Sequence, residues 1–144
     1  MSDQKLGAVL RLMHVEPSDL NRDESFGLRM RVQRVVYLLQ HTGEEGLRFS
    51  FSTYFRGPYS VDLAKACSLL GDAGSGSLKG ESLAAWFLDH DLEWLSTATT
   101  VIMLHGSFRD RPAEEYAAVR FYRQDLTEEE FGSILSQLRE KGVL

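Results

Sequence analysis

A mainly α-helical fold is predicted for this chain of 144 residues, on three observations. Apolar residues recur at helical spacing in most segments, only one short stretch alternates with a period of two, and capping or stop signals flank most of the helical patterns. We therefore expect about seven helices and one short extended segment in a single domain over residues 1–144. A subdivision into units at 1–80 and 81–144 fits the same pattern.

The first half is expected to begin with two helices. Residues 4–15 carry apolar side chains at helical spacing, and Glu16-Pro17 ends that helix because the residue before a proline avoids the α region. Residues 26–41 make the clearest amphipathic helix, with Arg31 and Arg34 on its solvated side. Its apolar stripe consists of Leu28, Val32, Val35, Val36 and Leu39.

The stretch FRGPYS, residues 55–60, follows the one segment that alternates with a period of two, at residues 47–55. Gly57 allows a backbone geometry that other residues resist, and Pro58 fixes its own φ and keeps Gly57 out of the α region. Ser60 is a good N-cap for a helix over 60–70, and Tyr59 can pack on that helix. Gly57, Pro58, Tyr59 and Ser60 are therefore predicted to form a rigid structural corner that turns an extended segment into a helix.

The second half is expected to be helical throughout. Residues 71–80 contain four glycines and are predicted to be a mobile loop. Further helices are predicted at 81–88, 91–105, 113–123 and 128–141, the third with Pro112 in its first turn and the last with a capping box at Thr127 and Glu130. The helix over 91–105 is apolar enough to be central and to join the two halves.

No set of residues predicts catalysis. The glycines of 71–80 have no strand before them and no GK[ST] after them, so they do not form a phosphate-binding loop. The four histidines are scattered, and Cys67 lies on the inward stripe of its helix without a partner histidine. We therefore expect no catalytic residue, no metal site, no cofactor and no enzyme activity.

Composition and charge narrow the partner classes. The chain has no apolar run of the length of a membrane span, no secretory signal and a single cysteine, which together predict a cytoplasmic protein without a membrane partner. The whole net charge of −5 falls in residues 63–144, which hold thirteen acidic and eight basic side chains. This balance disfavours nucleic acid, because phosphate binding usually needs a basic excess.

A basic group in the first half keeps a nucleic-acid alternative open. Helices 26–41 and 60–70 can form a helix-turn-helix with an elongated turn, and the 71–80 loop can stand where a wing often lies. The second helix offers only Lys65 as an outward base, which weakens this alternative. The candidate contact residues for nucleic acid or a partner are Arg29, Arg31, Arg34, Arg48 and Arg56.

Two segments carry a family resemblance. MRVQRVVYLLQ (30–40) followed by FSFSTYFRGPYSVDLAKACSLL (49–70) resembles uncharacterised prokaryotic proteins of the YwgA type, which pair a KLQKxVYL-type helix with an F-x-F-x-x-YGPYSxxL corner. Members often have basic residues before the position of Val32, and this chain keeps only part of that pattern. The segments are also distantly similar to the Panacea antitoxin domain.

These resemblances imply a winged-helix-like first half, and the second half resembles archaeal members with an extra helical unit. The YwgA-type resemblance implies no particular activity, whereas the Panacea resemblance implies neutralisation of a toxin by direct binding. We expect a non-enzymatic regulatory or protein-interaction module with a protein partner of unknown identity. The alternative is a winged-helix DNA-binding transcriptional regulator.

Overall fold

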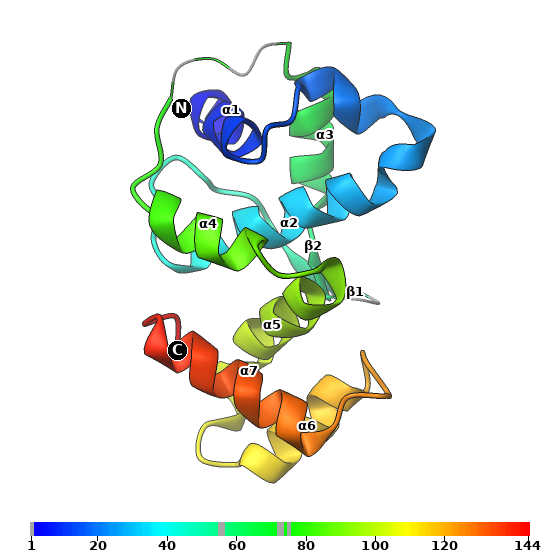
Figure 1. Ribbon diagram of the computed structural model, residues 1–144, viewed down its shortest axis with the longest axis vertical. Helices are drawn as coiled ribbons and strands as arrows, with labels where there is room; N and C mark the ends of the chain where they lie inside the picture. Colours follow the sequence, from blue (N-terminus) through cyan, green and yellow to red (C-terminus); the bar gives the residue numbers. More distant parts are fainter. Residues whose placement is uncertain (1, 55–56, 72–73, 75) are drawn as a thin grey trace.

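Seven α-helices and one β-hairpin make up the described part of the chain, which in this computed structural model comprises every residue except 1, 55, 56, 72, 73 and 75 (Figure 1). The prediction of a mainly α fold with about seven helices is thereby confirmed. Three 3₁₀ helices lie at Pro17–Asn21, Asp23–Ser25 and Gly106–Phe108. The helices are α1 (Ser2–Leu12), α2 (Phe26–His41), α3 (Val61–Leu69), α4 (Glu81–Leu88), α5 (Leu92–His105), α6 (Pro112–Arg120) and α7 (Glu128–Glu140).

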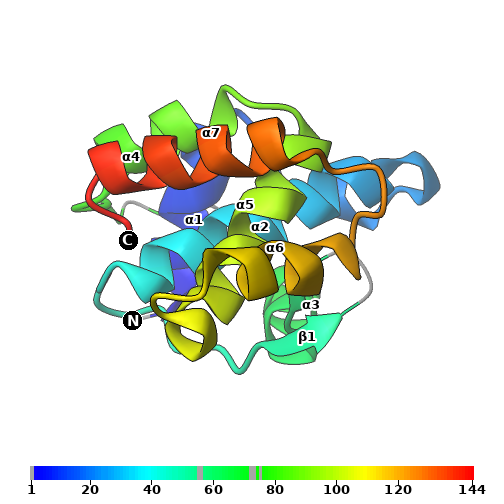
Figure 2. The same ribbon diagram turned by 90° about the horizontal axis from the view of Figure 1, so that it is seen from below.

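Helices α2 and α5 form the centre of the hydrophobic core. Helix α2 packs against α1, α3, α4 and α5, and α5 in turn packs against α6 and α7. In the view of Figure 2, α2 and α5 lie between α4 and α7 on one side and α3 and β1 on the other. The two central helices bury apolar side chains completely, which is the main driving force for this arrangement. These include Val35, Val36, Leu38, Leu39, Leu95, Ala98 and Val101.

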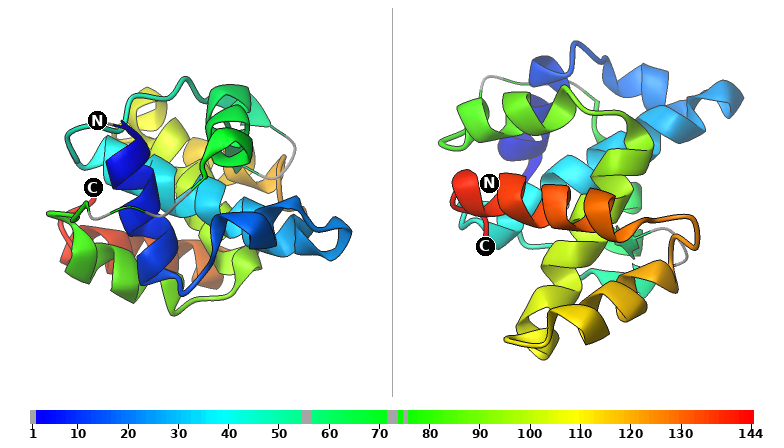
Figure 3. Two further views of the ribbon diagram at one scale, coloured as in Figure 1. Left: turned by 90° about the horizontal axis from the view of Figure 1, so that it is seen from above. Right: turned by 60° about the horizontal axis from the view of Figure 1, so that its bottom comes forward.

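Helices α6 and α7 pack against α5. Helix α7 crosses α5 in Figure 3 and buries its apolar stripe, which consists of Phe131, Ile134, Leu135 and Leu138. Its first turn is closed by the predicted capping box, since the amide of Glu130 donates to the Thr127 hydroxyl and the amide of Thr127 donates to the Glu130 carboxylate. Helix α7 therefore begins where the sequence predicts.

The predicted corner is a β-hairpin followed by a helix cap. Strands β1 (Ser52–Tyr54) and β2 (Gly57–Tyr59) pair antiparallel with Thr53 opposite Pro58, so Gly57-Pro58-Tyr59 is a strand rather than a bend. Gly57 has a φ of 131°, and a Cβ there would lie 3.2 Å from the Ser96 carbonyl oxygen. The cap is confirmed, because the Leu63 amide donates to the Ser60 hydroxyl over 3.1 Å.

The glycine-rich segment contacts α1 at residues 74, 76 and 77, among its described residues 71, 74 and 76–80, and its mobility stays a prediction. The Arg11 guanidinium donates to the carbonyls of Gly74 and Gly76. Lys5 donates to the Ser77 carbonyl over 3.0 Å, and a Cβ on Gly76 would overlap the Gln4 carbonyl oxygen. The backbone approaches α1 this closely because Gly76 has no side chain.

Two further predictions concern the absence of a membrane span and the winged-helix-like character of the first half. The described helices include none that is both long and apolar enough to cross a membrane. The only paired strands among the described residues precede α3, and the glycine segment after α3 lies along α1. The winged-helix-like character of residues 1–80 stays a prediction.

Candidate functional site

The arginines of α2 bind other segments of the chain. Arg29 donates to the carbonyls of Leu20 (2.9 Å) and Arg22 (2.8 Å), on the 3₁₀ helices before α2. Arg31 donates to the carbonyls of Leu88 and of His90, the latter over 2.9 Å, and so closes the end of α4. Among the carbonyl groups at a helix end, those of the last turn have no partner within the helix, so Arg31 acts there as a cap.

Arg34 is buried, with 3% of its surface exposed, and its predicted place on the solvated side of α2 is wrong. Its Nε donates to the Ser96 hydroxyl over 3.1 Å, and its Nη1 donates to the Pro58 carbonyl. The hairpin and α5 cover this side of α2, and helical periodicity alone does not contain that information. Burial lowers the pKa of the Arg34 guanidinium to about 10, which leaves it charged at neutral pH.

The five predicted contact residues therefore do not form one surface in the described structure. Arg29, Arg31 and Arg34 each have partners in a different part of the chain, and Arg48 is exposed in the connection before β1. Arg56 lies outside the described residues. The predicted corner residues lie in the interior of the fold. Gly57 and Pro58 are buried beside Arg34, and Ser60 is fully buried as the cap of α3.

A cavity of about 460 Å³ lies between α2, α5 and the turn that joins α6 to α7. Its volume falls within the range in which proteins bind small molecules or single side chains of a partner. Helix α2 supplies Met30 and Arg34 to its lining. The rest of the lining comes from α5 and the α6–α7 region, namely Leu92, Glu93, Ser96, Thr97, Thr100, Val119, Tyr122, Arg123, Gln124 and Asp125.

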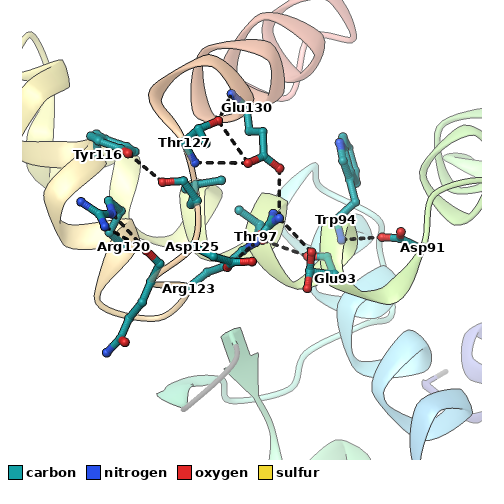
Figure 4. Close-up of polar contacts among 12 residues, drawn as sticks. Asp91, Glu93, Trp94, Thr97, Tyr116, Arg120, Arg123, Asp125, Thr127 and Glu130 are labelled. Atoms are coloured by element: carbon teal, nitrogen blue, oxygen red, sulfur yellow. Dashed lines mark hydrogen bonds and ion pairs between the residues drawn. The ribbon is translucent and has the colours of Figure 1, made fainter.

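Arg123 holds the α6–α7 turn against α5 (Figure 4). Its Nη2 lies 2.8 Å from Glu93 Oε1 and 3.0 Å from Glu130 Oε2, while its Nε lies 3.3 Å from Asp125 Oδ1. Its Nη1 also donates to the Thr97 hydroxyl over 3.3 Å. Each carboxylate is largely exposed, so each ion pair alone contributes little stability, but four contacts fix one guanidinium in place.

Local hydrogen bonds shape the rest of the turn. The Tyr116 hydroxyl donates to the Leu126 carbonyl over 2.7 Å, and Arg120 donates to the Gln124 carbonyl over 2.9 Å (Figure 4). At the start of α5 the Asp91 carboxylate accepts from the Trp94 amide over 2.8 Å. These contacts lie beside the cavity, since Gln124 is the one residue among them that belongs to its lining.

Three hydroxyl residues of α5 face the cavity. Thr97 and Thr100 donate to the carbonyls four residues earlier, those of Glu93 and Ser96. Ser96 accepts from Arg34, and within the described structure its own hydroxyl proton has no acceptor. The lining of the cavity therefore combines a buried positive charge with a hydroxyl donor beside it.

Sequence patterns did not predict this site. Ser96, Thr97 and Thr100 fall in an apolar helix predicted to be central, and the run STATT at 96–100 was the one available signal, since hydroxyl groups in a buried helix need partners. Arg123 and Tyr122 were placed in a helix that the structure ends at Arg120. Their convergence with α2 depends on contacts far apart in sequence, which periodicity does not predict.

Cys67 lines a second, smaller cavity of about 120 Å³ between α2 and α3. Burial raises the pKa of its thiol to about 11, so the thiol is protonated at neutral pH and is a weak nucleophile. Within the described chain, no three histidine, cysteine or acidic side chains lie together as metal ligands. These findings give no support to a catalytic or metal-binding role for either cavity.

The comparisons with known proteins give no match: no family model, no curated protein and no solved structure is significantly similar to this chain. The resemblance to YwgA-type proteins and to the Panacea domain therefore stays an expectation from residues 30–70. The larger cavity, described from its own geometry, is the candidate functional site.

Proposed function

We propose that this chain is a non-enzymatic protein-interaction module that binds a segment of a protein partner at the cavity between α2, α5 and the α6–α7 turn. The observation that carries the proposal is the cavity itself, with its mixed lining. Met30, Leu92 and Val119 supply apolar surface, while Arg34 and the α5 hydroxyl groups supply polar contacts. Binding sites typically combine mostly apolar walls with a few fixed polar groups.

An exposed aromatic side chain next to the cavity supports a protein partner. Phe121 is 81% exposed, and its ring lies edge-on to that of Tyr122, a lining residue, with 5.3 Å between ring centroids. Aromatic side chains dominate the energetics of protein interfaces because each buries a large area. A partner segment that fills the cavity can also cover Phe121.

No specific observation favours the alternative of a DNA-binding regulator. The arginines of α2 that suggested it donate to backbone carbonyls inside the molecule. The lining and its surroundings also bring together Glu93, Asp125 and Glu130, whose charges repel phosphate. We expect no binding to a labelled DNA duplex at low salt.

Affinity capture with two matched variants tests the proposal. Gln124→Trp places an indole at an exposed lining position, and Ser136→Trp places one on the exposed side of α7, outside the lining. We expect the wild-type protein and Ser136→Trp to retain a common partner from a lysate of source cells. Gln124→Trp should lose that partner, because the indole fills the cavity.

The captured protein is then identified by mass spectrometry, purified and titrated against the three proteins by calorimetry. The proposal requires at least tenfold weaker binding to Gln124→Trp than to Ser136→Trp, with circular dichroism showing equal folding. Partners that bind both variants equally, or no partner at all, would exclude this cavity as the interaction site.

A further inference from the structure

The polar groups in the lining of the large cavity indicate what part of a partner it accepts. The Ser96 hydroxyl accepts from Arg34 Nε over 3.1 Å, so its proton points elsewhere, and the described residues offer it no acceptor. Tyr122 and Gln124 also line the cavity, and no hydrogen bond of the Tyr122 hydroxyl or the Gln124 side-chain amide occurs within the described chain. The cavity thus presents several donors to a ligand.

The positive charge of Arg34 determines which kind of ligand these donors favour. The guanidinium is buried, retains its proton at neutral pH and lies within hydrogen-bond distance of Ser96. A hydroxyl that accepts from a cation is polarised and becomes a stronger donor. The preferred guest beside these groups is therefore an acceptor with negative charge.

The acidic residues of the lining limit how much negative charge the guest can carry. Glu93 and Asp125 belong to the lining and share the single guanidinium of Arg123 with Glu130. The three carboxylates outnumber that guanidinium, so this group repels a doubly charged phosphate more than a single carboxylate. A carboxylate on a short apolar stem satisfies both the donors and the apolar part of the lining, formed by Met30, Leu92 and Val119.

From this geometry we infer that the cavity binds the side-chain carboxylate of an acidic residue in a partner peptide, with Ser96, Arg34 and Tyr122 of its lining as the contacts. The inference rests on the proposed function and specifies its ligand. Charge-assisted hydrogen bonds contribute more than neutral ones, so replacing the carboxylate by an amide should weaken binding about tenfold or more.

The test uses amide NMR spectra of the ¹⁵N-labelled full chain. Acetyl-Gly-Glu-Gly-amide is titrated against acetyl-Gly-Gln-Gly-amide, which has the same shape without the charge. We expect saturable shifts of the Ser96, Thr97 and Tyr122 amides with the Glu peptide and binding about tenfold weaker with the Gln peptide. Equal affinities, or shifts confined to other parts of the chain, would overturn the inference.

Variants locate the contact. Ser96→Ala removes the hydroxyl donor and should reduce binding of the Glu peptide to the level of the Gln peptide, whereas Ser136→Ala, on the exposed side of α7, should leave it unchanged. Tyr122→Phe removes only one hydroxyl at a half-buried position, so it provides a second test if Ser96→Ala does not fold. If both variants fold and both bind the Glu peptide as wild type does, the inference is contradicted. If Ser96→Ala does not fold, unchanged binding by Tyr122→Phe alone contradicts it.

The two proposals fail in different ways. If Gln124→Trp loses the partner but the Glu and Gln peptides bind equally well, the carboxylate inference is contradicted and the proposed interaction function still holds. A partner that still binds Gln124→Trp contradicts the proposed function, whatever the peptides do.

Discussion

Glu44 joins three segments of the chain at one buried carboxylate. Lys5 of α1 donates to its Oε2 over 2.8 Å, and the amides of Lys79 and Gly80 donate to its two oxygens over 3.1 and 2.8 Å. Burial raises the pKa of Glu44, but the bonds from Lys5, Gly80 and Lys79 outweigh it, so the pKa lies below its ordinary value of 4.5. The carboxylate thus fastens the segment before α4 to α1 and α2.

Glu44→Gln is expected to lower the free energy of unfolding by about 1–3 kcal/mol at pH 7, because buried charge-assisted hydrogen bonds are lost. A pKa below the ordinary value means that the contribution of Glu44 is present above that value and is lost as the pH falls through the folded pKa. The stability difference between wild type and Glu44→Gln should therefore shrink below about pH 4.

Urea denaturation between pH 3 and 8 measures this difference, with Glu45→Gln as the control at the exposed neighbouring position. Glu45→Gln should stay within about 0.5 kcal/mol of wild type. A difference for Glu44→Gln that is constant over this pH range would contradict the assigned role of the carboxylate.

At the scale of single residues, the sequence predicts apolar burial better than polar burial. Val35, Val36 and Leu39 lie in the core as their spacing indicates, whereas Arg34 was expected in solvent. A buried arginine needs acceptors, and its acceptors come from Pro58 and from Ser96, 62 residues away. Single-sequence periodicity has no access to such distant partners.

At the scale of elements, α3 depends on its N-terminal cap. The Ser60 hydroxyl accepts from the Leu63 amide, and the backbone amide and carbonyl of Ser60 bind the side chain of Gln33, each over 2.9 Å. Helix α3 buries only Leu63 completely, so tertiary packing holds it less firmly than the other helices of the core. Its first turn is therefore fixed mainly by these hydrogen bonds.

Ser60→Ala is expected to cost about 1–2 kcal/mol of stability, because it removes the cap and leaves the Leu63 amide buried without a partner. The change in the urea midpoint, with an unchanged slope, measures this cost. Ser68→Ala, at an exposed position of the same helix, is the matched control and should cost much less. Equal effects of the two substitutions would show that the cap does not stabilise α3.

The helices were predictable because each carries its own local signals. Helices α2, α5 and α7 begin or end within a few residues of the predicted bounds, since their apolar stripes, caps and terminal glycines act within one or two turns. The hairpin was not predicted. Strands β1 and β2 are three residues each, and their pairing is set by contacts of β2 with α2 and α5.

At the scale of the whole molecule, α5 belongs to both halves of the chain. It packs against α2 and β2 on one side and against α6 and α7 on the other. Leu95, which is fully buried in α5, therefore lies in a core that both halves share. A loss of packing at this position should destabilise the entire chain and not one half.

Leu95→Ala is expected to lower the free energy of unfolding by about 2–5 kcal/mol, because it leaves a cavity in the core. Tryptophan fluorescence reports on Trp86 in α4 and Trp94 in α5, and far-UV circular dichroism reports on all helices. The two urea transitions should coincide in wild type and variant. Separate transitions would mean that the halves unfold independently, and Leu69→Ala, at an exposed residue, should change neither curve.

The candidate site could not be predicted at this scale. Its lining draws on α2, α5 and the α6–α7 turn, so it exists only after the two halves have packed together. Sequence patterns predicted the elements but not which of their polar residues converge. Among the four predicted contact residues that the structure describes, Arg34 is the one that lines the cavity, and it is buried rather than exposed.

Met30 belongs to the lining of both the larger cavity and the smaller one beside Cys67. Methionine is unbranched and has three rotatable bonds, so the side chain of Met30 can adapt its shape to an occupant of either cavity. Where a ligand in the larger cavity displaces Met30 toward Cys67, the space around the thiol becomes smaller, and where a group attached to the thiol displaces Met30 the other way, the larger cavity becomes smaller. By thermodynamic reciprocity, each occupant changes the affinity for the other by the same factor.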